Sequence, residues 1–510
     1  MKNLIKISFF TLIFLAQVLF AQIKSTHQFE DEYYKEHLPK SWALNFQVEK
    51  QFSNLQLNKT VFGYLPWWQY LIGSHKNLRY DLLSHIAIFS FEADSLGNIS
   101  NPAGWPWGDV IAKSKENKVK LILTVTNFDA NSIHSLFSVE ERRTKLFSNI
   151  SQTIKTYGFE GINIDFENVK VNDRNSVISN FFSEMKKYFL QQNIAAEISF
   201  ASPAASFGGW NFYQIASACD YLFIMGYDFY GSWSSTTGPS APLSGGFFNL
   251  NKSLSSDYLS VVQNIPNKLI LGVPYYGNYW RTKTSNAYTS VDTVKAKRNW
   301  VKHIFYNEVV SSYNSKEQLW DFTSNTPWIR WQDSTWNQIW YDSDTSLALK
   351  YDLAINKNLK GVGIWALGYD DGREELWKVI EDKFAKPTNI AEKEIPVQAR
   401  LYQNYPNPFN PETTINYTIP PNVKGETINV TLKVYDVLGR EIATLVDEVK
   451  QPGIYNSKFL ASLDASRSGS IINSSPRSTR VGAGQFSSGV YFYTLRTGSY
   501  SETRKMIFSK

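Results

Sequence analysis

The sequence of 510 residues predicts an α/β protein: a (β/α)8 barrel with a small insertion between strand 7 and helix 7, followed by a small all-β sandwich. Three observations support this fold. Eight short apolar runs alternate with helix-like stretches. Polar residues stand at the C-terminal ends of several of these runs, where such barrels carry their chemistry. After residue 385 the composition shifts toward Pro, Lys, Glu and Ala, and short β-type runs follow.

The barrel strands are predicted from aliphatic and aromatic runs, and we expect them at residues 61–66, 85–91, 120–127, 161–167, 195–202, 221–228, 269–275 and 361–366. Helices are expected between several of them, including 139–156, 174–192 and 347–358. The segment 277–345 is too long for a plain loop and is rich in Trp, Tyr and Thr. It therefore predicts a small inserted subdomain.

The N-terminus begins with a basic stretch, continues with an apolar run over 7–20 and ends in Ala21, which predicts a secretory signal peptide at 1–21. An N-terminal membrane anchor is the alternative, but the apolar run is short for a bilayer. Residues 22–58 read as a polar N-terminal extension. No later segment approaches the length of a membrane span.

Charge and cysteine content exclude several classes of protein. Removal of 1–21 takes away Lys2, Lys6 and no acid, so the net charge falls from +6 to +4, with no basic stripe for nucleic acid. Cys219 is the sole cysteine, so no internal disulfide forms. The histidines show no ligand spacing, so we expect no metal site and no cofactor; they are His27, His37, His75, His85, His134 and His303. A monomer is expected.

The octet 160–167 carries the chemistry. Apolar Ile162, Ile164 and Phe166 alternate with Asn163, Asp165 and Glu167, which is the period of a strand. The three polar side chains therefore form one row on one face. Burial of such a row is costly unless its members are paired or used. The alternative without a function is a half-exposed strand whose polar side chains face solvent.

Paired carboxylates in an aromatic-rich barrel suggest glycoside hydrolysis, because sugar rings stack on aromatic faces. All sixteen tryptophans fall between Trp42 and Trp377, although a large core would use many of them. A negative Asp165 one strand period from Glu167 raises the proton affinity of Glu167, as a general acid requires. The strand offers no separate nucleophile across the sugar, which favours a nucleophile supplied by the substrate.

The octet resembles the DxxDxDxE signature of family 18 glycoside hydrolases, the chitinase family. Four further motifs agree: Phe62-Gly-Tyr-Leu-Pro-Trp-Trp68, Met225-Gly-Tyr-Asp228, Gly272-Val-Pro-Tyr-Tyr-Gly277 and Gly363-Ile-Trp-Ala-Leu-Gly368. The resemblance covers residues 59–384. It implies a TIM barrel and retaining hydrolysis of β-1,4-linked N-acetylglucosamine, in which the 2-acetamido oxygen attacks the anomeric carbon and forms an oxazolinium intermediate.

The resemblance also implies roles for individual residues. Glu167 would protonate the leaving oxygen and then activate water, while Asp165 would orient the acetamido group. Tyr227 and Asp228 would hold that group from the other side. Tyr64 would support Asp165 from beneath, and Trp365 would form the floor under the reacting sugar. Met225, Tyr275 and Tyr276 are further substrate-binding candidates. The two tyrosines either line the cleft or only pack.

Two positions depart from the signature. Glu160 replaces its first Asp, before the inward row, and Asn163 replaces its middle Asp. Asn163 can donate to Asp165 but cannot relay a proton, so a shifted pH optimum is expected. The run Gly161-Ile-Asn-Ile-Asp-Phe-Glu167 and the run 340–350 resemble a branch of bacterial spore-cortex and cell-wall N-acetylglucosaminidases. Chitin-type polymer and peptidoglycan are thus alternative substrates. A non-catalytic sugar-binding barrel is the rival from another class, which the retained Asp165, Glu167 and Tyr227 disfavour.

The C-terminal region begins after a linker at 385–400, and its predicted strands lie at 413–419, 429–437, 441–445, 489–495 and 505–508. Residues 466–486 are rich in Ser, Arg and Gly and are expected to be disordered. Motifs at 402–411, 434–440, 488–493 and 505–510 resemble the type IX secretion sorting domain, here 401–510. That implies interaction with the type IX machinery and a secreted or surface-attached enzyme that passes the periplasm and outer membrane. A carbohydrate-binding sandwich is the alternative, disfavoured by its lack of Trp.

Overall fold

The computed structural model describes residues 24–38, 55–292, 301–387, 399–420, 428–451, 453–461 and 487–509. The chain divides into two compact units, Met1–Thr388 and Asn389–Lys510. The predicted signal peptide, most of the predicted linker and the segment 466–486 lie outside the described residues. Within the described part, no helix is long and apolar enough to cross a membrane.

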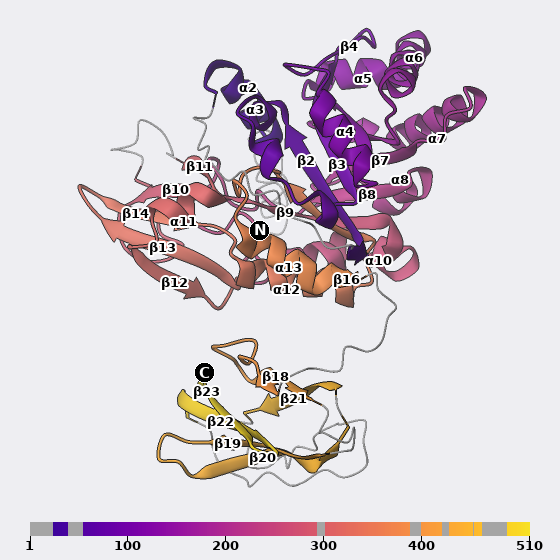
Figure 1. Cartoon of the computed structure of the whole chain (residues 1–510). Helices are drawn as coiled ribbons and strands as arrows, with labels where there is room; N and C mark the ends of the chain where they lie inside the picture. The colour runs from indigo at the N-terminus through magenta and orange to yellow at the C-terminus, as the bar shows by residue number, and fades with distance from the viewer. Residues whose placement is uncertain are drawn as a thin grey trace, which may run out of the picture. The chain divides into compact units, whose positions relative to one another are not determined.

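Eight parallel strands of the first unit close into a barrel, as the sequence predicts (Figure 1). Hydrogen bonds between the first and second of them complete the circle. In chain order the strands are β2 Thr60–Pro66, β3 His85–Ala93, β5 Lys120–Asn127, β6 Gly161–Phe166, β7 Glu197–Pro203, β8 Tyr221–Met225, β9 Leu269–Pro274 and β15 Gly361–Trp365. A short strand β4 (Ile99–Ser100) pairs antiparallel with β3, and β1 (Leu55–Leu57) pairs with β16 (Ala385–Pro387).

Helices cover the outside of the barrel and connect its strands. Their bounds are α3 Trp67–Leu71, α4 Gly108–Glu116, α5 Ala130–Ser138, α6 Glu140–Tyr157, α7 Ser176–Gln191, α8 Phe212–Ala218, α9 Leu250–Lys252, α10 Leu259–Asn264, α12 Asp344–Asn356 and α13 Glu374–Phe384. Several have local sequence causes. Helix α6 stops at Gly158, which adopts φ 75°, and Ser343 caps the N-terminus of α12.

Large aromatic side chains fill the barrel interior, and neighbouring strands leave room for them. Phe223 from β8 is buried and packs against Phe62 and Tyr64, with ring centroids 5.3 and 4.8 Å apart. A Cβ on Gly363 of β15 would lie 2.0 Å from the Phe223 ring. Glycine is therefore required at that position by close approach, since no larger residue fits beside this ring.

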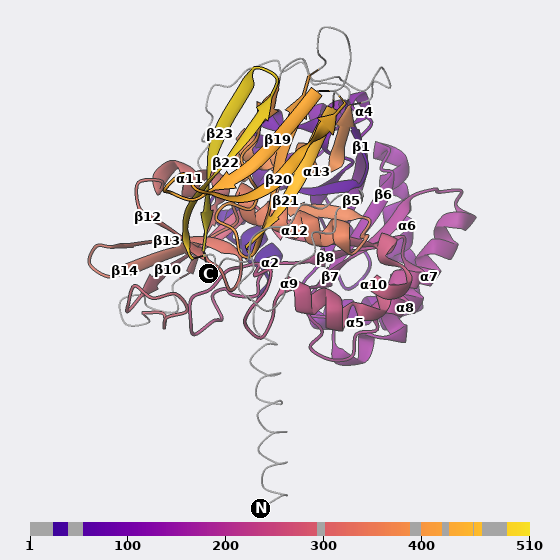
Figure 2. The same cartoon turned by 90° about the horizontal axis from the view of Figure 1, so that it is seen from below.

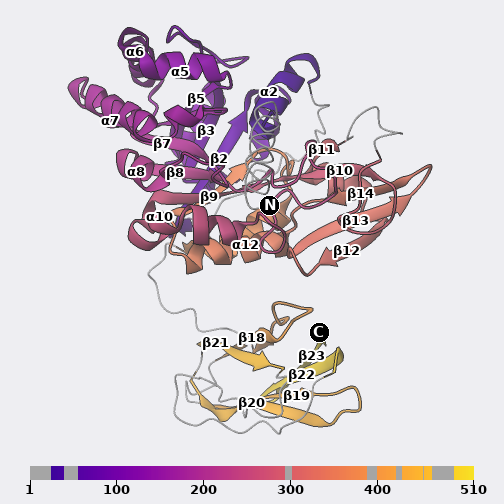
Figure 3. The ribbon, with the colours of Figure 1, turned by 180° about the vertical axis from the view of Figure 1, so that it is seen from behind.

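The predicted insertion between the seventh strand and its helix is a five-stranded antiparallel sheet. Its strands are β10 Tyr276–Thr282, β11 Val301–Phe305, β12 Glu317–Asp321, β13 Thr326–Gln332 and β14 Trp336–Trp340, with helix α11 Tyr306–Ser312 after β11. Figure 3 shows this sheet as a separate layer at the side of the barrel. Trp328 and Trp340 stack within it at 5.1 Å.

The second unit is an all-β domain of two sheets around its own apolar core, in agreement with the predicted sandwich. Strands β20, β19, β22 and β23 form the larger sheet (Figure 2). The strand bounds are β17 Arg400–Leu401, β18 Glu412–Ile419, β19 Ile428–Tyr435, β20 Glu441–Lys450, β21 Gly453–Leu460, β22 Gly489–Thr497 and β23 Tyr500–Phe508.

The helix in the N-terminal extension was not predicted. Residues Thr26–Glu36 of the N-terminal extension form α2, and Ser25 caps it by accepting a hydrogen bond from the Gln28 amide at 3.1 Å. The buried face of α2 is largely polar, with Thr26, His27, Glu30 and Asp31 among its buried residues. Such a helix lacks the apolar periodicity from which helices are recognised in sequence.

Candidate active site

Strand β6 presents the polar row toward the barrel interior. Asn163 and Asp165 are fully buried, and Glu167 follows the last strand residue with a side chain 10 % exposed. On the opposite face Phe166 packs near Phe181 of α7. Strand β6 is buried along its whole length, so the half-exposed alternative is excluded.

Asn163 lies at the deep end of the row. Its amide oxygen accepts a hydrogen bond from the Tyr64 hydroxyl at 2.7 Å, and its nitrogen donates to Ser199 at 3.0 Å. A donation from Asn163 to Asp165 is not among the hydrogen bonds of the described residues; the amide nitrogen donates instead to Ser199, which lies in register with Asn163 on β7. Asn163 therefore anchors Tyr64, and it supports the carboxylates only indirectly.

Asp165 and Glu167 form a tightly spaced pair. Each offers a carboxylate oxygen in a group of atoms that all lie within 4.8 Å of one another. Burial, followed by the negative charge of Asp165, raises the pKa of Glu167 to about 8, although His27 and the Ser25 hydroxyl oppose the rise. The raised pKa favours the protonated form of Glu167, which is the state that a general acid needs.

The C-terminal end of β8 brings two more predicted residues to the same place. Tyr227 is buried, and Asp228 follows it with φ 62°, a left-handed conformation that is uncommon outside glycine. The Tyr276 hydroxyl hydrogen-bonds to the Asp228 carboxylate and lies 2.9 Å from the Ser240 hydroxyl. Met225 is the last residue of β8 and is 9 % exposed.

Trp365 ends β15 and closes the group from below, fully buried, with its ring 5.4 Å from that of Tyr64. Tyr276 belongs to the group through Asp228. Tyr275 does not: it is buried, and burial raises the pKa of its hydroxyl, with Tyr351, Asp370 and Tyr306 as its other electrostatic neighbours. Of the two adjacent tyrosines, Tyr276 faces the predicted site residues and Tyr275 packs away from them.

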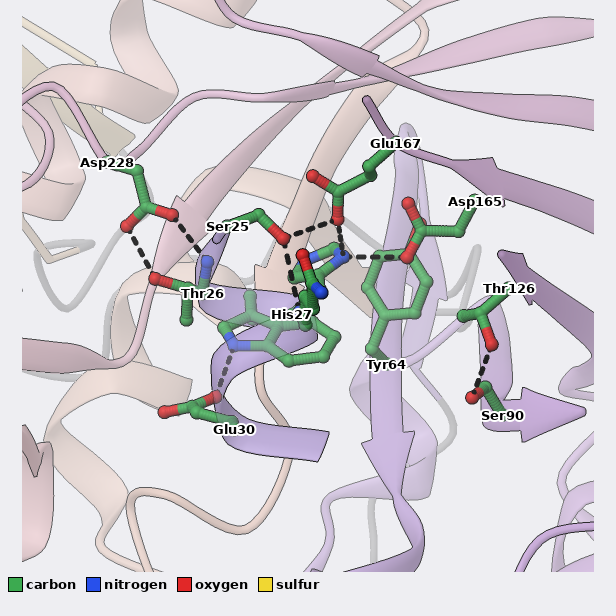
Figure 4. A network of polar contacts seen from close by, with 12 residues as sticks. Ser25, Thr26, His27, Glu30, Tyr64, Ser90, Thr126, Asp165, Glu167 and Asp228 are labelled. Carbon is green, nitrogen blue, oxygen red and sulfur yellow. Dashed lines mark hydrogen bonds and ion pairs between the residues drawn. The ribbon is translucent and has the colours of Figure 1, made fainter. Parts of the chain in front are cut away.

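Sequence reasoning missed the residues that α2 adds to this group (Figure 4). Nδ1 of His27 is 2.8 Å from Asp165, its Nε2 is 2.7 Å from the Tyr227 hydroxyl, and its ring stacks on Trp365 with centroids 3.6 Å apart. No spacing in the sequence links His27 to residues some 140 to 340 positions later, so no local signal could have found it.

The neighbours of His27 also set its charge. Burial opposes protonation of the imidazole, but the carboxylates of Asp165, Glu167 and Asp228 outweigh burial and raise the pKa of His27 above its ordinary value. His27, Asp165 and Glu167 have the atom types of a metal site. However, both ring nitrogens of His27 already have hydrogen-bond partners, so the arrangement is explained without an ion.

A model of the family "Glycosyl hydrolases family 18" matches residues 60–370, which include all eight barrel strands and every predicted site residue. The chain belongs to family 18 of the glycosyl hydrolases. It is thus a glycoside hydrolase on a TIM barrel, and the resemblance to family 18 is confirmed.

Among curated proteins, this family 18 chain is similar to "Probable chitinase 2" of Drosophila melanogaster, with 27% identity over 57% of this chain and 62% of that protein, less than two thirds of its length. It is also similar to the cortical fragment-lytic enzyme of Bacillus subtilis, with 21% identity over 59% of this chain and 68% of that enzyme. Among solved structures, the Group IV chitinase of Ostrinia furnacalis in complex with allosamidin has a TM-score of 0.56 and 21% identity, covering 64% of this chain and 98% of that one. The last likeness supports the fold.

Proposed function

We propose that the chain hydrolyses β-1,4-linked N-acetylglucosamine polymers of the chitin or chito-oligosaccharide type with retention, using the acetamido group of the substrate as nucleophile. The observation that carries this proposal is the Asp165–Glu167 pair. One carboxylate oxygen of Asp165 lies within 4.8 Å of one of Glu167, and the pKa of Glu167 is raised to about 8. An inverting pair needs about 6.5–9.5 Å to admit a water between its carboxyl groups, so this pair is too close for inversion.

The proposed reaction has two steps. The Glu167 carboxyl protonates the glycosidic oxygen while the acetamido oxygen attacks the anomeric carbon, so the bond to the leaving sugar breaks and an oxazolinium ring forms. Asp165 accepts the acetamido N–H and balances the developing positive charge, with Tyr227 opposite it. Water then adds at the same carbon, Glu167 takes its proton, and the ring opens to the product with retained configuration.

Peptidoglycan is the second candidate substrate, and Asn163 favours it. The Asn in Gly161-Ile-Asn-Ile-Asp-Phe-Glu167 is the feature shared with the cell-wall branch, and the similarity to the cortical fragment-lytic enzyme points the same way. Mass analysis of products from chitin oligomers and from purified peptidoglycan, digested side by side, decides between the two.

The first test is Glu167→Gln, which keeps the shape of the side chain but removes its acid. We expect turnover of a fluorogenic chito-oligosaccharide to fall by about 10²–10⁴-fold, with folding and sugar binding retained. A thiazoline mimic of the oxazolinium should inhibit the wild type competitively. Equal rates for mutant and wild type would refute the role of Glu167 as the acid. Absence of inhibition by the thiazoline would refute the proposal that the acetamido group of the substrate is the nucleophile.

We further propose that residues 401–510 direct type IX export to the cell surface or medium. The support is the set of motifs named above and the separate apolar core of the second unit. In a host with that machinery, deletion of 401–510 should leave the enzyme in the periplasm, whereas the full chain should reach the outside. Equal export of both forms would contradict this assignment.

A further inference from the structure

The residues proposed to act on the sugar are covered by the chain itself. Asp165 and Trp365 are fully buried, and Tyr227 is 4 % exposed. A cavity of about 600 Å³ opens nearby at the C-terminal ends of β3 and β5, but its lining includes none of these residues. Since a glycan must reach them to react, whatever covers them has to leave first. Helix α2 and the preceding Ser25 are what cover them.

His27 occupies the place proposed for the acetamido sugar. Its ring lies on the face of Trp365 at 3.6 Å and 26°, as a sugar ring would on the floor of the site. One nitrogen reaches Asp165, and the other reaches the Tyr227 hydroxyl. These are the two groups proposed to hold the N–H and the oxygen of the acetamido group. In the neutral form of His27 that carries its proton on Nδ1, the ring donates to Asp165 as the acetamido N–H would and accepts from the Tyr227 hydroxyl as the acetamido oxygen would.

The start of α2 engages the remaining carboxylates. The Ser25 hydroxyl donates to Glu167 at 2.8 Å, which ties up the proposed acid. The Thr26 amide and hydroxyl donate to the two oxygens of Asp228 at 3.0 and 2.6 Å. The N-terminal end of a helix carries free N–H groups and partial positive charge, so it suits a cluster of carboxylates.

Further along, the buried acids of α2 find partners in the barrel. Glu30 is 1 % exposed, and its carboxylate accepts hydrogen bonds from Trp365 Nε1 at 2.9 Å and from the Tyr369 hydroxyl at 2.7 Å. Asp31 accepts one from Trp67 Nε1 at 2.8 Å. A buried carboxylate without partners would be costly. The buried acids of α2 are therefore held by hydrogen bonds from side chains of the barrel.

We propose that residues 25–36 form an autoinhibitory segment, in which His27 occupies the subsite of the reacting N-acetylglucosamine and the chain rests in a closed state. The inference rests on the proposed function, because it identifies the occupied place as the sugar subsite. Docked segment and bound glycan compete for the same atoms of Trp365, Asp165 and Tyr227. Displacement of the segment is then required before each productive encounter, and the fraction of open molecules sets the resting activity.

The decisive experiment measures kcat/KM of full-length variants on a soluble fluorogenic chito-oligosaccharide. His27→Ala removes the ring and both hydrogen bonds, and Thr26→Ala weakens the contact with Asp228. We expect both to raise kcat/KM, His27→Ala by about tenfold or more, because they shift the population toward the open state. Glu36→Ala, at an exposed position of the same helix, is the matched control and should leave kcat/KM unchanged. Reduced activity of His27→Ala would overturn the proposal and make His27 part of the working site.

A second measurement does not depend on turnover. In calorimetry, a peptide of residues 24–38 should bind the His27→Ala enzyme, and chito-oligosaccharide should displace it. Peptide concentrations up to millimolar are needed, because the peptide lacks the covalent tether that holds the segment near the site. The same peptide with His27→Ala is its control. Simultaneous binding of peptide and sugar would refute competition for one subsite. If the peptide competes with the sugar but no variant cleaves any glycan, the proposed hydrolysis fails and the autoinhibitory contact stands.

Discussion

Glu167 shows how one residue acquires its chemistry from its surroundings. In water a glutamic acid is ionised at neutral pH, but burial and the charge of Asp165 raise the pKa of Glu167 to about 8. The octet contained this information, since the strand period places both carboxylates on one face. The opposing influences of His27 and Ser25 were not in the octet, because those residues arrive from a distant part of the chain.

The charge of Asp165 beside Glu167 predicts the direction in which the alkaline limb of the pH profile is displaced, since this cause of the raised pKa belongs to strand β6 and not to α2. A general acid must be protonated, so activity is present below the pKa of Glu167 and is lost as pH rises through it. Because the charge of Asp165 contributes to the rise, Asp165→Asn in the His27→Ala background should move the alkaline limb of kcat/KM to lower pH, besides lowering its maximum. Measurement of kcat/KM over the pH range on both sides of that limb determines the shift. An alkaline limb at unchanged pH would contradict the assignment of the raised pKa of Glu167 to the charge of Asp165.

A buried ion pair predicts a large effect on stability. Lys350 is fully buried in α12 and pairs with Asp342, which also accepts a hydrogen bond from Ser346 at 2.6 Å. Lys350→Met leaves the Asp342 charge unpaired, so we expect a loss of about 3–5 kcal/mol in unfolding free energy, and the double variant with Asp342→Leu should regain most of it.

The control for that measurement is Lys378→Met. Lys378 and Asp382 are both exposed and lie 2.7 Å apart, so this change should cost less than about 1 kcal/mol. Similar losses at both positions in denaturant titrations would show that burial is not the cause. The Lys350–Asp342 pair also gives the run 340–350 a structural role. The sequence alone had shown only that this run resembles the branch of spore-cortex and cell-wall N-acetylglucosaminidases.

At the scale of elements, prediction succeeded where the apolar pattern was regular. The predicted strand 120–127 coincides with β5, and 161–167 differs from β6 only by the final Glu167, whose backbone amide still donates to the Asn127 carbonyl of β5 at 3.1 Å. Helix α2 was missed because it buries polar residues against polar partners. Such a surface has meaning only once the barrel exists, so its role is a tertiary property and cannot be read from local periodicity.

The docking of α2 predicts an unusual hydrogen-exchange result. A bound ligand ordinarily slows exchange wherever it changes the protein. Here, chito-oligosaccharide added to the catalytically impaired Glu167→Gln chain should speed amide exchange in Thr26–Glu36 while slowing it at the ends of β6 and β8, because the sugar replaces the helix. Slower exchange in both places would show that helix and sugar bind together.

At the scale of the whole molecule, the alternation of strands and helices predicted the barrel, the length of the segment 277–345 predicted the insertion, and the change of composition after residue 385 predicted the separate β-domain. The sequence pattern could not reveal the strand order of the insertion. The five strands within residues 276–340 do not pair in chain order, and their partners are fixed only in the folded sheet. Nor could the sequence pattern place helix α2 over the ends of the barrel strands, since that contact joins residues 25–30 to residues more than a hundred positions later in the chain.

The two units, each with a core of its own, predict two unfolding transitions in calorimetry. Leu432→Ala removes a fully buried side chain from the second core and should cost about 2–5 kcal/mol there. We expect it to lower only one transition and to leave kcat/KM unchanged. A shift of both transitions would show that the units unfold together.

The helical face of α2 has a consequence for how this enzyme could change under selection. His27, Glu30 and Tyr34 share one face because they follow the helical period, so loss of a single residue between them would rotate the rest by about 100°. Such a deletion would free the enzyme without altering any residue of the barrel. Mutations in this one short segment can thus change the fraction of molecules in the open state, whereas mutations on the barrel strands change which glycan the enzyme cleaves.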